Sequence, residues 1–333
     1  MRCSGIRKYK TAGGVYPASC HLFPYFYIIP FFMRRYLIVP ILLILFFTHV
    51  SFLIPPAGFI SERQVDVKIT FKVNVNGHLN KMRFKMVIPE NIRQRQLVDD
   101  LTFSIEPDSM YKANGNSYAL FRFYDVDKDF KIVVKSRLTI YSVINTAADT
   151  AKSDFSKYLV AEPNIEAESE KIISTAQSLK QKTDIETVMR TFEFVKEHIT
   201  YKRNAAIGAE KVLESGIGKC MDYSDLFVAL LRANNIPAKS MFGIVVSDHA
   251  NPLHAWPEAY LKRQGWIRFD PTSGHSDIET DGKNFKMRIS NKYVTLSEGR
   301  NDPELRASLY HYNYNCSKGG SVSVKTSFDI EGE

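Results

Sequence analysis

Cysteine is scarce in this sequence of 333 residues, and its four cysteines follow no repeated spacing. No C-x-x-C pair occurs among them; they are Cys3, Cys20, Cys220 and Cys316. A structural zinc site and a disulfide framework both require paired or regularly spaced cysteines. The sequence therefore argues against both, and spacing does not decide whether Cys220 and Cys316 pair.

The chain also lacks the basic stripe of a nucleic-acid-binding protein. Its net charge is +8, but six basic residues and no acidic residue occur before residue 61. The rest of the chain carries 38 basic and 36 acidic residues, a difference of only +2. Because no run of basic residues has interleaved aromatics, we expect no nucleic acid among the partners. The hydrophobic content of 44% is that of a globular protein long enough for two domains.

A long apolar run occupies residues 37–47, shortly after two arginines. Such a run is typical of a signal peptide, and its extension to residue 54 is just long enough for a transmembrane helix. Residues 54–57 are a poor match to a small-x-small cleavage site, so we favour an uncleaved anchor. We expect residues 33–56 to be a signal or transmembrane anchor, with the arginines in the cytoplasm and the domains that follow the anchor extracytoplasmic.

Residues 1–32 do not fit this plan of an exported or membrane-anchored protein. We expect them to be a non-native or disordered extension. Translation from Met33 is then a hypothesis that N-terminal sequencing tests.

Residues 61–150 show the alternation of half-buried β-strands. Apolar and polar residues alternate from Val65 to Val75 and again over residues 82–88, with the turn signal Asn76-Gly77 between them. This pattern predicts a hairpin. Two further strand-like runs follow, at 118–124 and 130–144. We expect an antiparallel, sandwich-like β domain without catalytic residues, used for packing, positioning or partner binding.

Helical spacing begins after Asp154. Apolar residues three and four apart predict helices over 172–179 and 185–199, and Thr183 with Glu186 predicts a capping box. A third helix is expected from Cys220, where the glycine-rich turn 216–219 ends.

Cys220 is the first candidate for chemistry. A thiolate at the first residue of a helix is stabilised by the positive end of the helix dipole, which makes it a better nucleophile at neutral pH. The alternative is a packing role, because free cysteine is among the most buried residue types.

Two strands after this helix predict partners for the thiol. The run from His254 to Leu261 and the run from Trp266 to Asp270 are joined by a turn. In such a hairpin the start of one strand and the end of the next lie at the same edge, so His254 and Asp270 are within direct or diagonal reach.

Cys220, His254 and Asp270 together are the parts of an acyl-transfer site. The thiolate attacks a carbonyl carbon, the imidazole holds and returns the proton, and the carboxylate orients the imidazole. The backbone N–H of Cys220 is the expected oxyanion donor, and no second donor can be assigned.

Four motifs in this region occur in the order of a known family. They are G-x-G-x-C-x-D-Y from Gly216, L-R-A-x-x-I-P-A from Leu231, H-A-W-x-E from His254 and G-W-x-x-F-D-P-T from Gly265. In order and spacing, residues 155–300 resemble the transglutaminase-like superfamily of papain-type thiol enzymes, in its microbial form. The resemblance implies a Cys-His-Asp triad at Cys220, His254 and Asp270 that acts on amides.

The resemblance implies no calcium, although animal members use it, because no D-x-D-x-D-G loop is present. We therefore expect no cofactor and no metal. Trp256 and Glu258 match the motif but receive no catalytic role.

The expected architecture is α+β. A membrane segment and the β domain precede a papain-like, transglutaminase-like core at 155–311, in which the helix that begins with Cys220 packs on an antiparallel sheet. Residues 312–333 are expected to be a C-terminal strand or tail.

Several alternatives stay open. The histidines His249, His254 and His275 surround Asp248 and Asp270, which suggests a metal site, but none has the i, i+4 spacing of helical ligands. We expect His249 and His275 to be loop residues at the mouth of the cleft. A binding module without activity is a second alternative.

The expected partner is a peptide or protein substrate, with the membrane contacted through the N-terminal segment. The oligomeric state is not indicated. We favour hydrolysis over protein cross-linking, since an export-anchored single-copy domain lacks the additional β domains of animal cross-linking enzymes.

Overall fold

The computed structural model describes residues 58–144, 154–202, 208–246, 252–280, 284–305 and 308–332. The expected extension at 1–32 and the predicted anchor at 33–56 both lie outside these ranges. Within the described ranges, no helix has both the length and the apolar character needed to cross a membrane. Residues 56–333 cluster as one compact unit.

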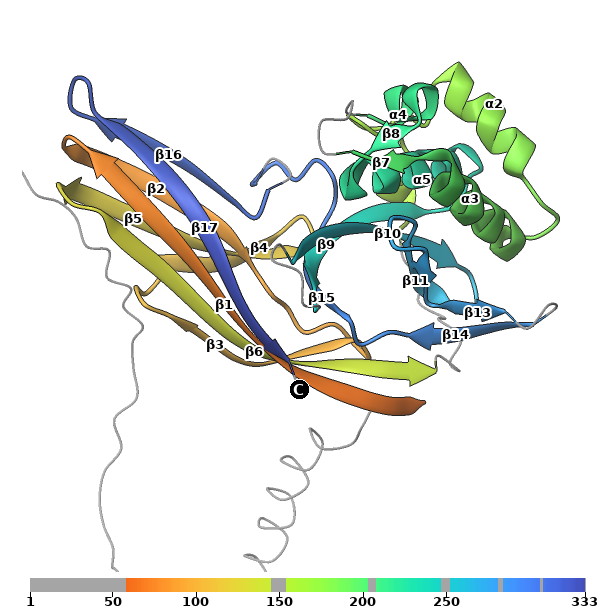
Figure 1. Ribbon diagram of the computed structural model, residues 1–333, viewed down its shortest axis with the longest axis horizontal. Coiled ribbons are helices and arrows are strands. Elements are labelled where there is room, and N and C mark those ends of the chain that lie inside the picture. Colours follow the sequence, from red (N-terminus) through yellow and green to blue (C-terminus); the bar gives the residue numbers. More distant parts are fainter. Residues whose placement is uncertain are drawn as a thin grey trace, which may run out of the picture. The chain divides into compact units, whose positions relative to one another are not determined.

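Eight long strands form two facing sheets of a β-sandwich (Figure 1). They are β1 (Phe59–Asn76), β2 (Leu79–Ile88), β3 (Gln96–Phe103), β4 (Ser109–Ala113), β5 (Asn116–Val126), β6 (Phe130–Ile144), β16 (Tyr310–Cys316) and β17 (Ser321–Gly332). β1 buries every second residue from Val65 to Val73, as its alternation predicts. The C-terminal residues, expected as a strand or tail, form β16 and β17 of this sandwich.

The predicted hairpin between β1 and β2 is wrong. β1 pairs with β6 and β17, whereas β2 pairs with β5 and β16. The two strands face each other across the core, where the rings of Phe71 and Phe84 lie 5.1 Å apart. Alternation specifies which face of a strand is buried, and it does not specify the neighbouring strand. The turn at Gly77, with φ of 81°, therefore leads from one sheet to the other.

The second half of the chain contains the helices and a five-stranded sheet. The helices are η1 (Ser156–Tyr158), α2 (Glu170–Leu179), α3 (Asp184–His198), α4 (Ala209–Ser215) and α5 (Cys220–Ala233). The sheet contains β9 (Ala238–Val245), β10 (Leu253–Leu261), β11 (Gly265–Asp270), β12 (His275–Ser276) and β15 (Tyr293–Glu298), in the order β12-β11-β10-β9-β15. The predicted helices and the Thr183–Glu186 capping box are confirmed.

Short strands complete the described chain. β7 (Thr200–Tyr201) and β8 (Ile217–Gly218) pair in parallel, and β13 (Ile278–Thr280) pairs with β14 (Phe285–Ile289). β14 also pairs with β6, so the six-stranded sheet of the sandwich contains strands from both halves of the chain.

The five-stranded sheet lies between two hydrophobic cores. Helices α2 to α5 gather at one side of β9 and β10 (Figure 1), and their apolar residues share a core with Ala259 and Phe269 of the sheet. Ile244 and Val294 of the same sheet belong to the core of the sandwich. The architecture is thus mostly β with a layer of helices, which confirms the α+β class.

A single glycine allows three strands of this sheet to come together. A Cβ atom at Gly243 would lie 2.0 Å from the carbonyl oxygen of Val294 and 2.8 Å from the ring of Trp256. Because one of these neighbours is backbone, a side-chain movement cannot relieve the contact.

We expect Gly243→Ala to lower the free energy of unfolding by about 2–3 kcal/mol, through overpacking at the centre of the sheet. Urea unfolding followed by tryptophan fluorescence measures the change. An unchanged unfolding midpoint would show that the sheet has room for the methyl group.

Candidate active site

Cys220 lies where predicted, at the first residue of α5. Lys219 precedes the helix in an extended conformation, and its backbone N–H donates to the carboxylate of Asp222 at 2.8 Å. Gly218 is required nearby, because a Cβ there would lie 2.9 Å from Cβ of Asp222. Cys220 is partly exposed, whereas the residues after Met221 on α5 are buried as far as Arg232. The thiol is therefore accessible at the end of a helix that the core holds in place.

The predicted proximity of His254 and Asp270 is confirmed. β10 and β11 pair with Glu258 opposite Arg268, a register that puts Asp270 diagonal to His254 on the same face. Nε2 of His254 and Oδ2 of Asp270 are 2.9 Å apart. This contact leaves Nδ1 as the ring nitrogen that can face the thiol.

Two partners of Asp270 were not found from the sequence. The hydroxyl of Tyr293 on β15 donates to Oδ2 at 2.9 Å, and the backbone N–H of Ser273 donates to Oδ1 at 3.2 Å. Burial raises the pKa of Asp270, but the hydrogen bonds from His254, Ser273 and Tyr293 outweigh it and hold this pKa below its usual value. The carboxylate is therefore ionised at neutral pH and aligned on the imidazole.

His254 is hydrogen-bonded to Asp270 through Nε2, and the side chain of Cys220 is close enough to contribute to the pKa of the imidazole. Burial lowers the pKa of His254, but the hydrogen bonds and charges of Asp270 and Cys220 outweigh it and raise this pKa to about 9. The indole of Trp256 lies alongside, with ring centres 6.4 Å apart. At neutral pH the imidazole thus carries the proton.

This shift makes stability depend on pH in a defined window. Because the pKa of His254 is higher in the folded than in the unfolded protein, protonation of this residue stabilises the fold. Its contribution to the free energy of unfolding is complete below the unfolded pKa of about 6.5 and is lost as the pH rises through about 9. We expect the free energy of unfolding to fall between pH 6 and pH 10 by more in the native protein than in His254→Gln. Denaturant unfolding of both proteins at the two pH values tests this, and parallel pH profiles would contradict it.

Buried arginine contacts hold the elements of the site together. Nε of Arg300, in the loop after β15, donates to the two carboxyl oxygens of Asp225 on α5, at 3.1 and 2.9 Å, and burial raises the pKa of this carboxyl to about 8. The guanidinium of Arg95 from the sandwich binds the carboxylate of Glu258 and the backbone carbonyl of Trp266. Glu258, which received no role from the sequence, therefore joins β10 to the sandwich. No local pattern in the sequence indicates either arginine.

The metal alternative receives no support from the described residues. Among them, no group of three or more histidine, cysteine, aspartate or glutamate side chains could hold a metal ion. His275 lies on β12, paired in register with Asp270, and its ring stacks on Tyr293, so it is not the loop residue we expected. His249 lies outside the described residues.

The family of this site follows from comparison with known sequences. Residues 173–271 match the model of the transglutaminase-like superfamily, a range that contains Cys220, His254 and Asp270. This part of the chain is transglutaminase-like. The resemblance inferred from the motifs is confirmed.

Curated relatives are similar to only part of this chain. The uncharacterized protein YebA of Bacillus subtilis is 29% identical over 101 residues, which are 26% of this chain and 14% of YebA. An uncharacterized protein of Mycobacterium tuberculosis is 26% identical over 133 residues, 35% of this chain and 38% of that protein. The matches thus span well under half the length of these relatives.

A solved structure extends the likeness over most of the fold. A protein of Cytophaga hutchinsonii, described as a candidate cysteine protease, has a TM-score of 0.61 and 15% identity, with coverage of 82% of this chain and 91% of that protein. The likeness shows a shared fold. The periplasmic domain of TgpA from Pseudomonas aeruginosa is more distant, with a TM-score of 0.34, 16% identity and coverage of 60% and 73%.

Proposed function

We propose that this protein is a transglutaminase-like thiol enzyme that hydrolyses peptide or amide bonds. The observation that supports it most is the hydrogen bond between His254 and Asp270, together with a partly exposed Cys220 whose side chain helps raise the pKa of that imidazole. Nucleophilic acyl transfer needs a thiol, a base near it and a carboxylate that orients the base.

The proposed reaction has two steps. Sγ of Cys220 bonds to the carbonyl carbon, the C–N bond breaks, and the proton of His254 passes to the leaving amine. Water then attacks the thioester, gives a proton to His254, and the C–S bond breaks. Asp270 and Tyr293 act by keeping the imidazole oriented. The N–H of Cys220 is a first-turn amide without an acceptor inside the helix, which leaves it free for the oxyanion.

Hydrolysis is favoured over transfer to an amine by one comparison. The Cytophaga hutchinsonii protein that shares the fold is described as a candidate cysteine protease. Cross-linking uses the same triad, with a lysine amine in place of water as the acyl acceptor. Incorporation of a fluorescent primary amine into added casein, dependent on Cys220, would favour cross-linking.

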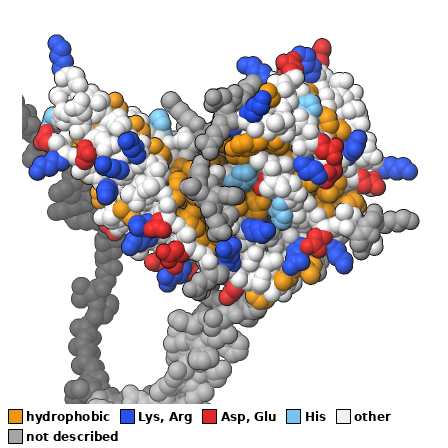
Figure 2. All heavy atoms as spheres, in the orientation of Figure 1, with side chains coloured by type: hydrophobic (Ala, Val, Ile, Leu, Met, Phe, Trp, Pro, Cys, Tyr) orange, Lys and Arg blue, Asp and Glu red, His pale blue; other side chains and the backbone are white. Residues whose placement is uncertain are grey.

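We further propose that the catalytic part is extracytoplasmic and that residues 33–56 attach it to a membrane. The support is the apolar run at 37–47 after Arg34 and Arg35. On the face that Figure 2 shows, basic and acidic side chains are interspersed. Protease protection of the full chain in spheroplasts tests the orientation.

Selective alkylation tests whether the thiol is activated. Cys220 and Cys316 are both partly exposed, so access alone predicts similar rates. We expect iodoacetamide at pH 7 to modify Cys220 about 10–100 times faster than Cys316, because Cys220 begins α5 near the imidazole of His254, whereas Cys316 ends a strand of the sandwich. Peptide mass spectrometry at timed intervals measures both rates.

Two variants serve as controls for this experiment. Cys316→Ala should leave the fast rate unchanged, and His254→Ala should reduce it towards the rate of Cys316. Equal rates for the two cysteines in the native protein would mean that Cys220 is an ordinary thiol and that the fold serves as a binding module.

A further inference from the structure

Arg268 is a buried cation on the strand that ends at Asp270. The residue is 1% exposed, and its Nε has no hydrogen-bond partner in the described part of the chain. Nη1 donates to the backbone carbonyl of Ser290 at 3.1 Å and lies 3.9 Å from the carboxylate of Asp277. A buried charge with so few partners is costly, which indicates that Arg268 has a role beyond packing.

Arg268 does not pair with the carboxylate of the candidate triad, although both belong to β11. The two residues are two positions apart, so their side chains share one face of the strand. The described structure contains no ion pair between Arg268 and Asp270; the guanidinium carbon instead lies 4.4 Å from the ring centre of Tyr293. A direct pair would neutralise the charge that Asp270 presents to His254.

Tyr293 connects the cation to the triad. Its hydroxyl donates to Oδ2 of Asp270 at 2.9 Å, and Nε2 of His254 lies 2.9 Å from the same oxygen. The positive charge of Arg268 over the ring draws electron density from the phenol, which makes its hydroxyl a stronger donor. Because the phenol and the imidazole share one oxygen, a stronger phenol donor leaves that oxygen less basic towards the imidazole.

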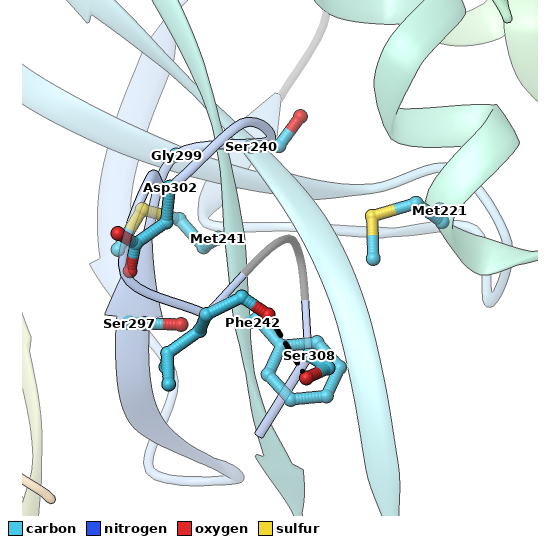
Figure 3. Close-up of a pocket in the computed structure, with 9 residues that line it drawn as sticks. Met221, Ser240, Met241, Phe242, Ser297, Gly299, Asp302 and Ser308 are labelled. Atoms are coloured by element: carbon cyan, nitrogen blue, oxygen red, sulfur yellow. Dashed lines mark hydrogen bonds between the residues drawn. The ribbon is translucent and has the colours of Figure 1, made fainter. Parts of the chain in front are cut away.

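The ring of Tyr293 is held in place by its neighbours. Met241, Trp256 and Tyr293 form a small hydrophobic core, in which the two rings are 5.1 Å apart. Figure 3 shows Met241 on β9, at a hollow that Met221 of α5 also lines and that has room for about one water molecule. The imidazole of His275 stacks on Tyr293, with ring centres 5.7 Å apart. These contacts keep the hydroxyl of Tyr293 on Asp270.

We propose that Arg268 is a positioning residue of the triad, which acts through Tyr293 to weaken the hold of Asp270 on the imidazolium of His254. The inference rests on the proposed thiol chemistry and adds a group that regulates its proton transfer. His254 gives its proton to the leaving amine, and an imidazolium held too strongly by a carboxylate is a poor acid. The described titratable or charged groups around His254 and the phenol are Cys220, Asp270, Tyr293, Arg268, His275 and Asp277.

An NMR titration of His254 tests the proposal. The full chain carries isotope-labelled histidine and Cys220→Ala, so that the thiol does not titrate with the imidazole, and His254→Gln identifies the signal. We expect Tyr293→Phe to raise the pKa of His254 by about 0.5–1 pH unit, because Oδ2 of Asp270 then accepts from the imidazole alone. Arg268→Met should raise this pKa by about 0.3–0.5 pH unit.

A double variant tests the route through the phenol. Without the hydroxyl of Tyr293, Arg268→Met should raise the pKa of His254 no further than Tyr293→Phe alone. Arg268→Gln, which retains an amide donor, replaces Arg268→Met if the latter does not fold. Lys239→Met is the matched control: Lys239 is another buried cation over an aromatic ring, 4.5 Å from Trp266, and its loss should leave this pKa at the native value.

A native or lower pKa of His254 in Tyr293→Phe would overturn the proposal, and this variant keeps the ring on which the neighbouring side chains pack. Fully additive rises in the double variant would also overturn it, because Arg268 would then act on His254 directly. These titrations do not depend on turnover, so either result leaves the thiol chemistry intact. Equal alkylation rates of Cys220 and Cys316 would instead contradict the proposed function.

Discussion

Replacement of Cys220 with alanine is expected to lower the rate of peptide or amide cleavage by about 10⁴-fold or more. The sulfur atom forms the bond to the carbonyl carbon, and no other described side chain in contact with His254 could replace it as a nucleophile. Cys220 is only partly buried, so the free energy of unfolding should change by less than about 1 kcal/mol. Cleavage of a defined peptide mixture, followed by mass spectrometry, measures the first effect and urea unfolding the second.

Cys316→Ala is the control for this loss. It removes a cysteine of similar exposure from β16 in the sandwich, and it should leave cleavage unchanged. If Cys220→Ala still cleaved peptides at the native rate, the thiol mechanism would be wrong.

The second large effect is expected at Arg95, through stability. Arg95 forms an ion pair with Glu258, and the side chains are 12% and 3% exposed. Burial raises the pKa of Glu258, but the charges of Arg95, Lys239 and Arg268 outweigh it and hold this pKa below its usual value. Arg95→Ala leaves this carboxylate buried with Lys239 at 4.0 Å, so we expect a loss of about 3–5 kcal/mol in the free energy of unfolding.

A solvent-exposed ion pair of the same sandwich is the control, because exposed pairs contribute little to stability. Nζ of Lys68 lies 3.2 Å from Asp329, with side chains 46% and 60% exposed. Lys68→Ala should therefore cost less than about 1 kcal/mol. Arg95→Met combined with Glu258→Gln should lose less stability than Arg95→Ala alone, because no unpaired charge remains buried. Equal losses for Arg95→Ala and Lys68→Ala would show that the buried pair does not join the sandwich to β10.

The contacts of Arg95 would give the β domain a supporting role, although this domain contributes no residue of the candidate triad. Glu258 lies four residues after His254 on β10, and Trp266 begins the strand that ends at Asp270. Arg95 binds both strands of this hairpin from the sandwich. The β domain thus supports the hairpin that carries the base and its orienting carboxylate.

Local patterns were sufficient for the elements and for three residues of the candidate site. Period-two alternation predicted β1 and β10, the turn after β10 predicted β11 as its return strand, and the helical spacing with a glycine-rich turn predicted α5 with Cys220 at its start. The pairing of His254 with Asp270 followed because a hairpin is a local structure, in which a short turn determines which residues meet.

Contacts between distant parts of the chain were decided only by the tertiary structure. The partners of β1 are β6 and β17, although β2 follows it in sequence, because pairing depends on which strands complete the two sheets. Tyr293, Arg300 and Arg95 reach the site from elements far from Cys220 in the chain, and such long-range partners carry no local pattern. The sequence by itself indicated the candidate thiol, base and carboxylate, through a local hairpin for His254 and Asp270 and through the helix start and the family motifs for Cys220. Tertiary packing decided what orients and supports them, because this depends on how the sheets and helices meet.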